Sequence, residues 1–164
     1  MNNFEQIITL GRSLIFRPII ACIGSTKDLG DSLGPLVGTL LEEKYKTNAI
    51  VIGTLLSPLH ALNLTERIPS TIEEYPQSKV IAVDACAFSE NKDCIRIIKG
   101  GIKPGLASGK DLPRIGDYSI VGSAYKFGGT THCLGKIYAL ADKIAKLINF
   151  LTSLSSSTFT QSNL

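Results

Sequence analysis

The sequence predicts an α/β protein, a three-layer α/β/α sandwich around a mostly parallel sheet. Short apolar runs at residues 18–23, 49–54 and 79–84 alternate with segments of helical periodicity, and this alternation is typical of parallel strands joined by helices. The run from Ala49 to Ile52 is apolar at every position, as expected for a strand that is covered on both faces.

The remaining elements follow from local patterns. We expect strands at residues 95–99 and 118–124 and helices at residues 4–14, 33–46 and 134–151. Ser57-Pro58 predicts the start of another helix that continues to about Glu66, because proline is favoured in a first helical turn. Ser70-Thr71-Ile72-Glu73 matches a capping box and predicts a further short helix.

The composition narrows the class of protein. The chain has 164 residues, enough for one domain, and its net charge of +3 comes without runs of like charge, so nucleic-acid binding is not indicated. No apolar run is long enough to span a membrane, and the first residues lack the basic start of a signal peptide. We expect a cytoplasmic protein with a domain at residues 1–151 and a flexible Ser/Thr-rich tail at residues 152–164.

Cysteine and histidine spacing gives no sign of a metal or cofactor site. The four cysteines form no C-x-x-C pair, and the two histidines, His60 and His132, lack ligand spacing to each other. Reduced thiols are the expected state. Cys86 is a candidate nucleophile, although a buried thiol is the commoner outcome for such a residue.

A glycine-rich loop between the first strand and the next helix is the strongest functional signal. It contains Gly24, Gly30, Gly34 and one acid, Asp31, and a second acid, Asp84, ends another strand. Carboxyl ends of parallel strands meet at the edge of the sheet where ligands usually bind. We therefore predict that the two aspartates face each other there, although an aspartate just before a helix is also a common N-cap.

Two adjacent carboxyl groups allow specific chemistry. Because two ionised carboxylates repel each other, such a pair shares a proton. One carboxyl group then acts as base on a water while the other protonates the substrate. The pair is also able to bind a metal. We expect backbone N–H groups of the Gly24–Gly34 loop or the Gly105–Gly109 loop to stabilise an oxyanion.

Three segments carry a resemblance to a known family: Gly30-Asp-Ser-Leu-Gly-Pro-Leu-Val-Gly38, Ile81-Ala-Val-Asp-Ala-Cys86, and Ile102-Lys-Pro-Gly105 with Gly109-Lys-Asp-Leu-Pro113. They resemble the YyaC family of sporulation proteins, related to the spore germination protease. The resemblance implies a phosphorylase/hydrolase-like fold, shared with the hydrogenase-maturation proteases. It also implies a cytoplasmic protein of the forespore or spore.

The same resemblance implies a function. The catalytic aspartates of the germination protease match Asp31 and Asp84, which implies an aspartate-dependent endopeptidase that acts on peptides or small spore proteins without a cofactor. Residues of the nearby loops are expected to bind the substrate, namely Gly24, Lys27, Ser32, His60, Lys103, Gly105 and Lys110. Where the family usually has arginine, this chain has Lys27, which offers a point charge in place of a planar fork.

Two alternatives stay open. In the first, the chain is a non-catalytic sporulation protein that binds a peptide or protein partner with the same fold, and Asp31 and Asp84 are structural. In the second, it is a metal-dependent maturation protease, a class in which two acids and a histidine bind nickel, although no histidine here stands at an obviously matching place.

Overall fold

The computed structural model describes residues 3–86, 94–104, 112–124 and 133–158. These residues form a five-stranded sheet in the order β2-β1-β3-β5-β4. The strands are β1 (Ile19–Cys22), β2 (Ile50–Ile52), β3 (Val80–Cys86), β4 (Ile95–Lys99) and β5 (Tyr118–Ser123). Only β4 among them runs antiparallel, against β5, so the predicted α/β class and mostly parallel sheet are confirmed.

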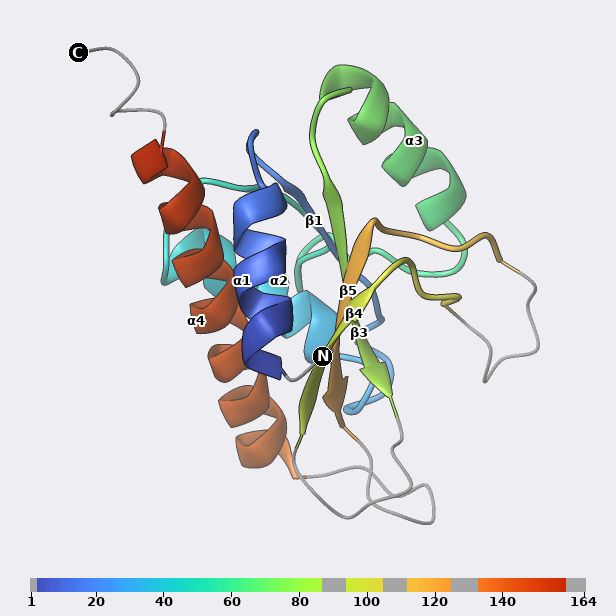
Figure 1. Ribbon diagram of the computed structural model, residues 1–164. Coiled ribbons are helices and arrows are strands. Elements are labelled where there is room, and N and C mark those ends of the chain that lie inside the picture. Colours follow the sequence, from blue (N-terminus) through green and yellow to red (C-terminus); the bar gives the residue numbers. More distant parts are fainter. Residues whose placement is uncertain (1–2, 87–93, 105–111, 125–132, 159–164) are drawn as a thin grey trace.

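Helices cover both faces of this sheet. They are α1 (Asn3–Ser13), α2 (Leu33–Glu43), α3 (Leu64–Glu74) and α4 (Leu134–Thr158). Figure 1 shows α1, α2 and α4 on one face and α3 on the other. Alternate residues of β1 point into the two resulting cores: Ile20 and Cys22 pack with α2 and α4, whereas Ile19 and Ala21 pack with α3. This alternation follows from the two-residue period of a strand.

Helix α3 begins later than predicted. The segment from Ser57 does not form a helix, because Leu59 pairs with Ile23 beyond the end of β1 and the chain turns into α3 only at Leu64. The predicted capping box at Ser70 is also wrong. It lies inside α3, where the hydroxyl of Ser70 donates to the carbonyl of Arg67 one turn earlier.

Helix α4 continues to Thr158, past the position where we expected the tail to begin. Leu151 and Thr152 are buried, and the Thr152 hydroxyl lies 3.1 Å from that of Thr47. Helix α4 is therefore packed against the domain as far as Thr152, although the polar composition of this stretch suggested a tail.

Two helical glycines set the position of α2. A Cβ on Gly34 would lie 2.0 Å from the carbonyl oxygen of Ile23, and one on Gly38 would lie 2.0 Å from that of Gly53. Both distances are far below van der Waals contact, so only glycine lets the helix backbone touch the strand ends. This contact holds the N-terminus of α2, and the Asp31 loop before it, against the carboxyl edge of the sheet.

Candidate active site at the carboxyl edge of the sheet

Backbone pairing beyond the end of β1 brings three chain segments together. The N–H of Ile23 donates to the carbonyl of Val83 at 2.8 Å, and the N–H of Gly24 donates to that of Leu59 at 2.8 Å. Asp84 follows Val83 directly, and His60 follows Leu59. One edge of the sheet therefore carries Asp84, the Gly24 loop and His60 side by side.

A tight turn presents Asp31 over this edge. Asp28 Oδ1 accepts hydrogen bonds from the N–H groups of Gly30, at 2.9 Å, and Asp31, at 3.2 Å, which is an Asx turn. The carbonyl of Asp31 accepts from the N–H of Ser25 at 3.1 Å. Gly24 has a φ of +148°, and a Cβ there would lie 2.0 Å from the Asp31 carbonyl oxygen, so the loop closes only over glycine.

Asp31 does not cap the following helix. The N-cap position belongs to Ser32, which makes no side-chain cap bond and instead donates its hydroxyl to the carbonyl of Leu29 at 2.6 Å. Within the described ranges, the Asp31 carboxylate accepts no hydrogen bond. The N-cap role that the sequence also allowed for Asp31 is therefore absent, and its carboxylate is not used to stabilise α2.

The charge of Asp31 acts on Asp84, whose pKa is strongly shifted. This half-buried side chain accepts a 2.8 Å hydrogen bond from the N–H of Ala85. Its pKa is raised from 3.8 to about 7, because burial disfavours the charged form and, to a smaller extent, because the negative charge of Asp31 acts on it. The Ala85 bond offsets part of this shift. Asp84 therefore exchanges its proton near neutral pH.

The structure gives the positions of three other residues that were predicted to bind substrate. His60 reaches the same edge, where its Nδ1 accepts from the N–H of Leu62 at 3.3 Å, an arrangement that places the ring proton on Nε2 when the imidazole is neutral. Lys27 is exposed in the Asp31 loop. Lys103, in contrast, follows the Ile102–Ile115 bridge, which extends the β4–β5 ladder past the amino end of β5 and away from the edge that carries Asp84.

Two further predicted residues, Gly105 and Lys110, lie outside the described residues. The substrate-binding roles assigned to all of these positions remain predictions. The Ser32 hydroxyl, through its bond to the Leu29 carbonyl, already uses its proton to hold the turn.

The oxyanion role expected for the Gly24 loop finds no support in its hydrogen bonds. Most of its N–H groups bind acceptors within the loop or on the neighbouring strand connection. The engaged groups belong to Gly24, Ser25, Lys27, Gly30, Asp31, Ser32 and Leu33. These bonds make the loop rigid. Because most N–H groups are engaged, the carboxylates are the groups of the loop that are able to take part in chemistry.

The donor set does not match a site of two acids and a histidine. Among the described residues, no three His, Cys, Asp or Glu side chains gather so that they could hold a metal. Cys86 is also a poor nucleophile as it stands: burial, with smaller contributions from Cys94 and Asp84, raises its pKa to about 12, so the thiol stays protonated at neutral pH.

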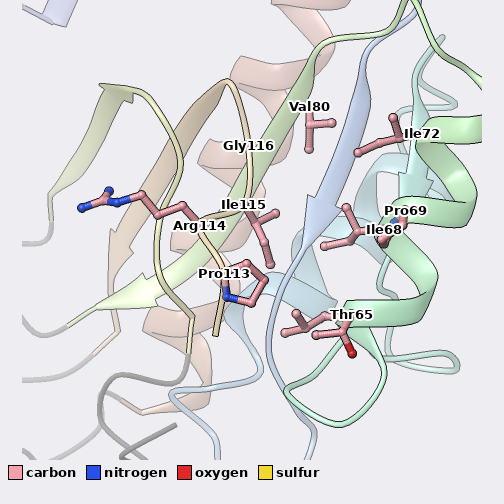
Figure 2. Close-up of a pocket in the computed structure, with 10 residues that line it drawn as sticks. Thr65, Ile68, Pro69, Ile72, Val80, Pro113, Arg114, Ile115 and Gly116 are labelled. Atoms are coloured by element: carbon pink, nitrogen blue, oxygen red, sulfur yellow. The ribbon is translucent and has the colours of Figure 1, made fainter. Parts of the chain in front are cut away.

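A separate apolar pocket of about 270 Å³ lies between α3 and the segment that leads into β5. Figure 2 shows Ile68, Pro69 and Ile72 of α3 facing Pro113 and Ile115 across it. Neither aspartate lines this pocket. Its walls carry no group suited to acid–base chemistry, and the one charged side chain in its lining, Arg114, donates to the carbonyl of Gly101.

Sequence reasoning missed two residues that position the site. Asp28 forms the turn under Asp31, and its signal is an aspartate two residues before a glycine. Asn63 accepts from the N–H of His60 at 2.9 Å and donates to the carbonyl of Pro58 at 3.0 Å. No local pattern pointed to Asn63, because its contacts depend on the pairing of Leu59 with Ile23.

Comparison with solved structures identifies the fold. It is similar to the crystal structure of the [NiFe] hydrogenase maturation protease HycI from Thermococcus kodakarensis KOD1, with a TM-score of 0.52 and 20% identity over 84% of this chain and 92% of that one. It is also similar to the solution structure of an endopeptidase HycI from Escherichia coli, with a TM-score of 0.56 and 18% identity over 80% and 88% of the chains. Identities this low establish the fold alone.

The family follows from the sequence comparison. The chain belongs to the family described as protein of unknown function DUF1256, whose model matches residues 2–147. It is 41% identical over 105 residues, or 63% of its length, to the protein described as uncharacterized protein YyaC from Bacillus subtilis (strain 168). The match spans 51% of that relative. The resemblance to YyaC is therefore confirmed. No helix in the described part of the chain is long and apolar enough to cross a membrane.

Proposed function

We propose that this protein is an aspartate-dependent endopeptidase, with Asp31 and Asp84 as its catalytic pair. The observation that carries the proposal is the pKa of about 7 at Asp84, raised in part by Asp31, at the ligand-binding edge of a protease-like fold. A group with such a pKa exchanges its proton readily at neutral pH, which general acid–base catalysis requires.

The pair supports hydrolysis in two steps. Asp31, as carboxylate, takes a proton from water, and the resulting hydroxide equivalent adds to the carbonyl carbon of the peptide. Protonated Asp84 donates its proton to the carbonyl oxygen. The proton now on Asp31 then passes to the amide nitrogen as the C–N bond breaks, and Asp84 recovers its proton from the intermediate hydroxyl. Both carboxyl groups return to their starting states.

The substrate class comes from the resemblance to sporulation proteins. We propose that peptides or small spore proteins are cleaved, in the cytoplasm of the forespore or spore. The HycI proteins with a similar fold are described as a maturation protease and an endopeptidase, which supports peptide-bond hydrolysis as the reaction.

Cleavage of small spore proteins by the purified chain tests the proposal. We expect D31N and D84N each to lower the rate at least 100-fold while leaving the circular dichroism spectrum unchanged, because asparagine keeps the shape but loses the acid–base function. E73Q, which removes an exposed carboxylate on α3, serves as the control and should retain full activity.

The same assay separates the alternatives. A folded D31N/D84N variant that still cleaves would overturn the catalytic pair. Partner binding that is unchanged in this variant, without cleavage by the wild type, would favour the non-catalytic protein. Metal that co-purifies with the wild type, but not with either single variant, would favour a metal-dependent protease.

A further inference from the structure

The loop between β2 and α3 exposes leucine side chains beside the candidate active site. Leu56 is 93% exposed and Leu62 is 79% exposed, and Leu55 lies at 36%. All three belong to the connection that leaves the carboxyl end of β2 and pairs with β1 through Leu59. Exposed apolar side chains that gather on a surface mark binding sites, and these three lie within residues 55–62.

This leucine loop, residues 54–63, is held firmly in place. The N–H of Thr54 donates to the carbonyl of Ser57 at 3.1 Å, and the N–H of Leu55 donates to Thr39 Oγ1 at 2.9 Å. Arg67 Nη1 donates to the carbonyls of Ser57 and Pro58 at 3.2 and 3.0 Å. The leucines are thus presented by a preorganised backbone, which reduces the entropy lost when a ligand binds.

The position of the loop indicates its occupant. Leu59 binds Gly24, Gly24 packs on Asp31, and Val83 on the other side of Ile23 leads into Asp84. The backbone of Leu59 is therefore about two strand spacings, roughly 10 Å, from the strand that carries Asp84. An extended polypeptide whose scissile bond lies at the carboxylates reaches the loop within about three residues.

We infer that the leucine loop is a specificity surface that binds bulky aliphatic side chains of the polypeptide substrate, a few residues from the bond that Asp31 and Asp84 cleave. This inference rests on the proposed peptidase function. It narrows the substrate to segments rich in leucine, isoleucine or valine.

Two measurements on the full chain test it. In the first, a mixture of random decapeptides is digested and the cleaved bonds are read by mass spectrometry. In the second, D84N is titrated with fluorescent decapeptides that differ only in one central residue, leucine or serine. Both measurements are repeated with the L56S/L62S substitutions, made in the wild type for the digestion and in D84N for the titration. L56A/L62A is a milder second variant. I15S is the matched control, because Ile15 is an aliphatic residue that is 61% exposed and precedes β1 at the opposite edge.

We expect cleavage to select aliphatic residues near the cut, and D84N to bind the leucine peptide at least tenfold more tightly than the serine peptide, since burying one leucine side chain is worth about that factor. L56S/L62S should lose both preferences and I15S should keep them. Cleavage without aliphatic selection, or selection that survives in L56S/L62S, overturns the inference but leaves the peptidase intact. If the wild type cleaves nothing, the peptidase proposal fails, and the binding titration alone decides: a preference lost in L56S/L62S supports the surface, and equal binding overturns it.

Discussion

Replacing Asp84 by asparagine should stabilise the protein at alkaline pH. The pKa of Asp84 is about 7 in the folded chain against an ordinary value of 3.8, and each pKa unit corresponds to roughly 1.4 kcal/mol. Ionising this group in place thus costs up to about 4 kcal/mol. Because solvent screens a half-buried carboxyl group, we expect about 2–4 kcal/mol in measured stability.

The direction with pH follows from proton linkage. Between pH 4 and 7, the folded state holds a proton on Asp84 that the unfolded state has released, so the free energy of unfolding falls as pH rises through this window. Asparagine does not titrate and keeps an oxygen that accepts the Ala85 bond. We therefore expect D84N and wild type to be equally stable near pH 4 and D84N to be more stable at pH 8.

Urea unfolding followed by far-ultraviolet circular dichroism measures this difference, since the chain has no tryptophan. E73Q is the control for losing one carboxylate and should follow the wild-type curve. A ¹³C NMR titration of Asp84 in D31N should give a lower pKa than in the wild type, but one still above 3.8, because burial is the larger cause. Wild type and D84N with the same dependence of stability on pH would refute the assignment.

Three further outcomes follow from the structure. G34A should lose at least about 3 kcal/mol of stability or fail to fold, because its Cβ would meet a backbone carbonyl at 2.0 Å. The control G135A, whose Cβ would meet nothing within 4 Å, should gain up to about 1 kcal/mol, and an equal loss in the thermal melts of both variants would contradict this. D28A should lower stability by about 1–2 kcal/mol and slow any cleavage, since two N–H groups lose their acceptor, while D28N should retain both properties; equal behaviour of the two variants would argue against the turn. Iodoacetamide at pH 7.5 should label exposed Cys133 far faster than Cys86, whose pKa is about 12, and rapid labelling of Cys86 in peptide maps would speak against its burial.

The sequence predicts the sheet and the position of both acids because these depend on local patterns. Apolar runs mark buried strands, and an acid that follows such a run lies at the carboxyl edge whatever the rest of the chain does. The prediction that Asp31 and Asp84 face each other depends further on β1 and β3 being neighbours, and these two strands are paired along the length of β1.

Other features depend on contacts that no local pattern encodes. Ser57-Pro58 begins no helix, because pairing of Leu59 with Ile23 draws the chain along the sheet. Gly34 lies in α2, where it allows the helix backbone to touch the end of β1, a role that the helical pattern alone does not show. Such close approach is a property of two segments together, so the sequence of either segment alone does not reveal it.

The strongest physical argument for a functional Asp84 is the stability that the fold loses by burying this carboxyl group. An asparagine at this position would accept the Ala85 hydrogen bond and avoid burying a charge, and no described ion pair repays the aspartate for its raised pKa. Asp31 adds to that cost while it makes no cap for α2. Two acids that destabilise the fold together lie at the edge where α/β sheets bind their ligands. Because the stability of the fold does not account for them, they fit the acid–base chemistry proposed above.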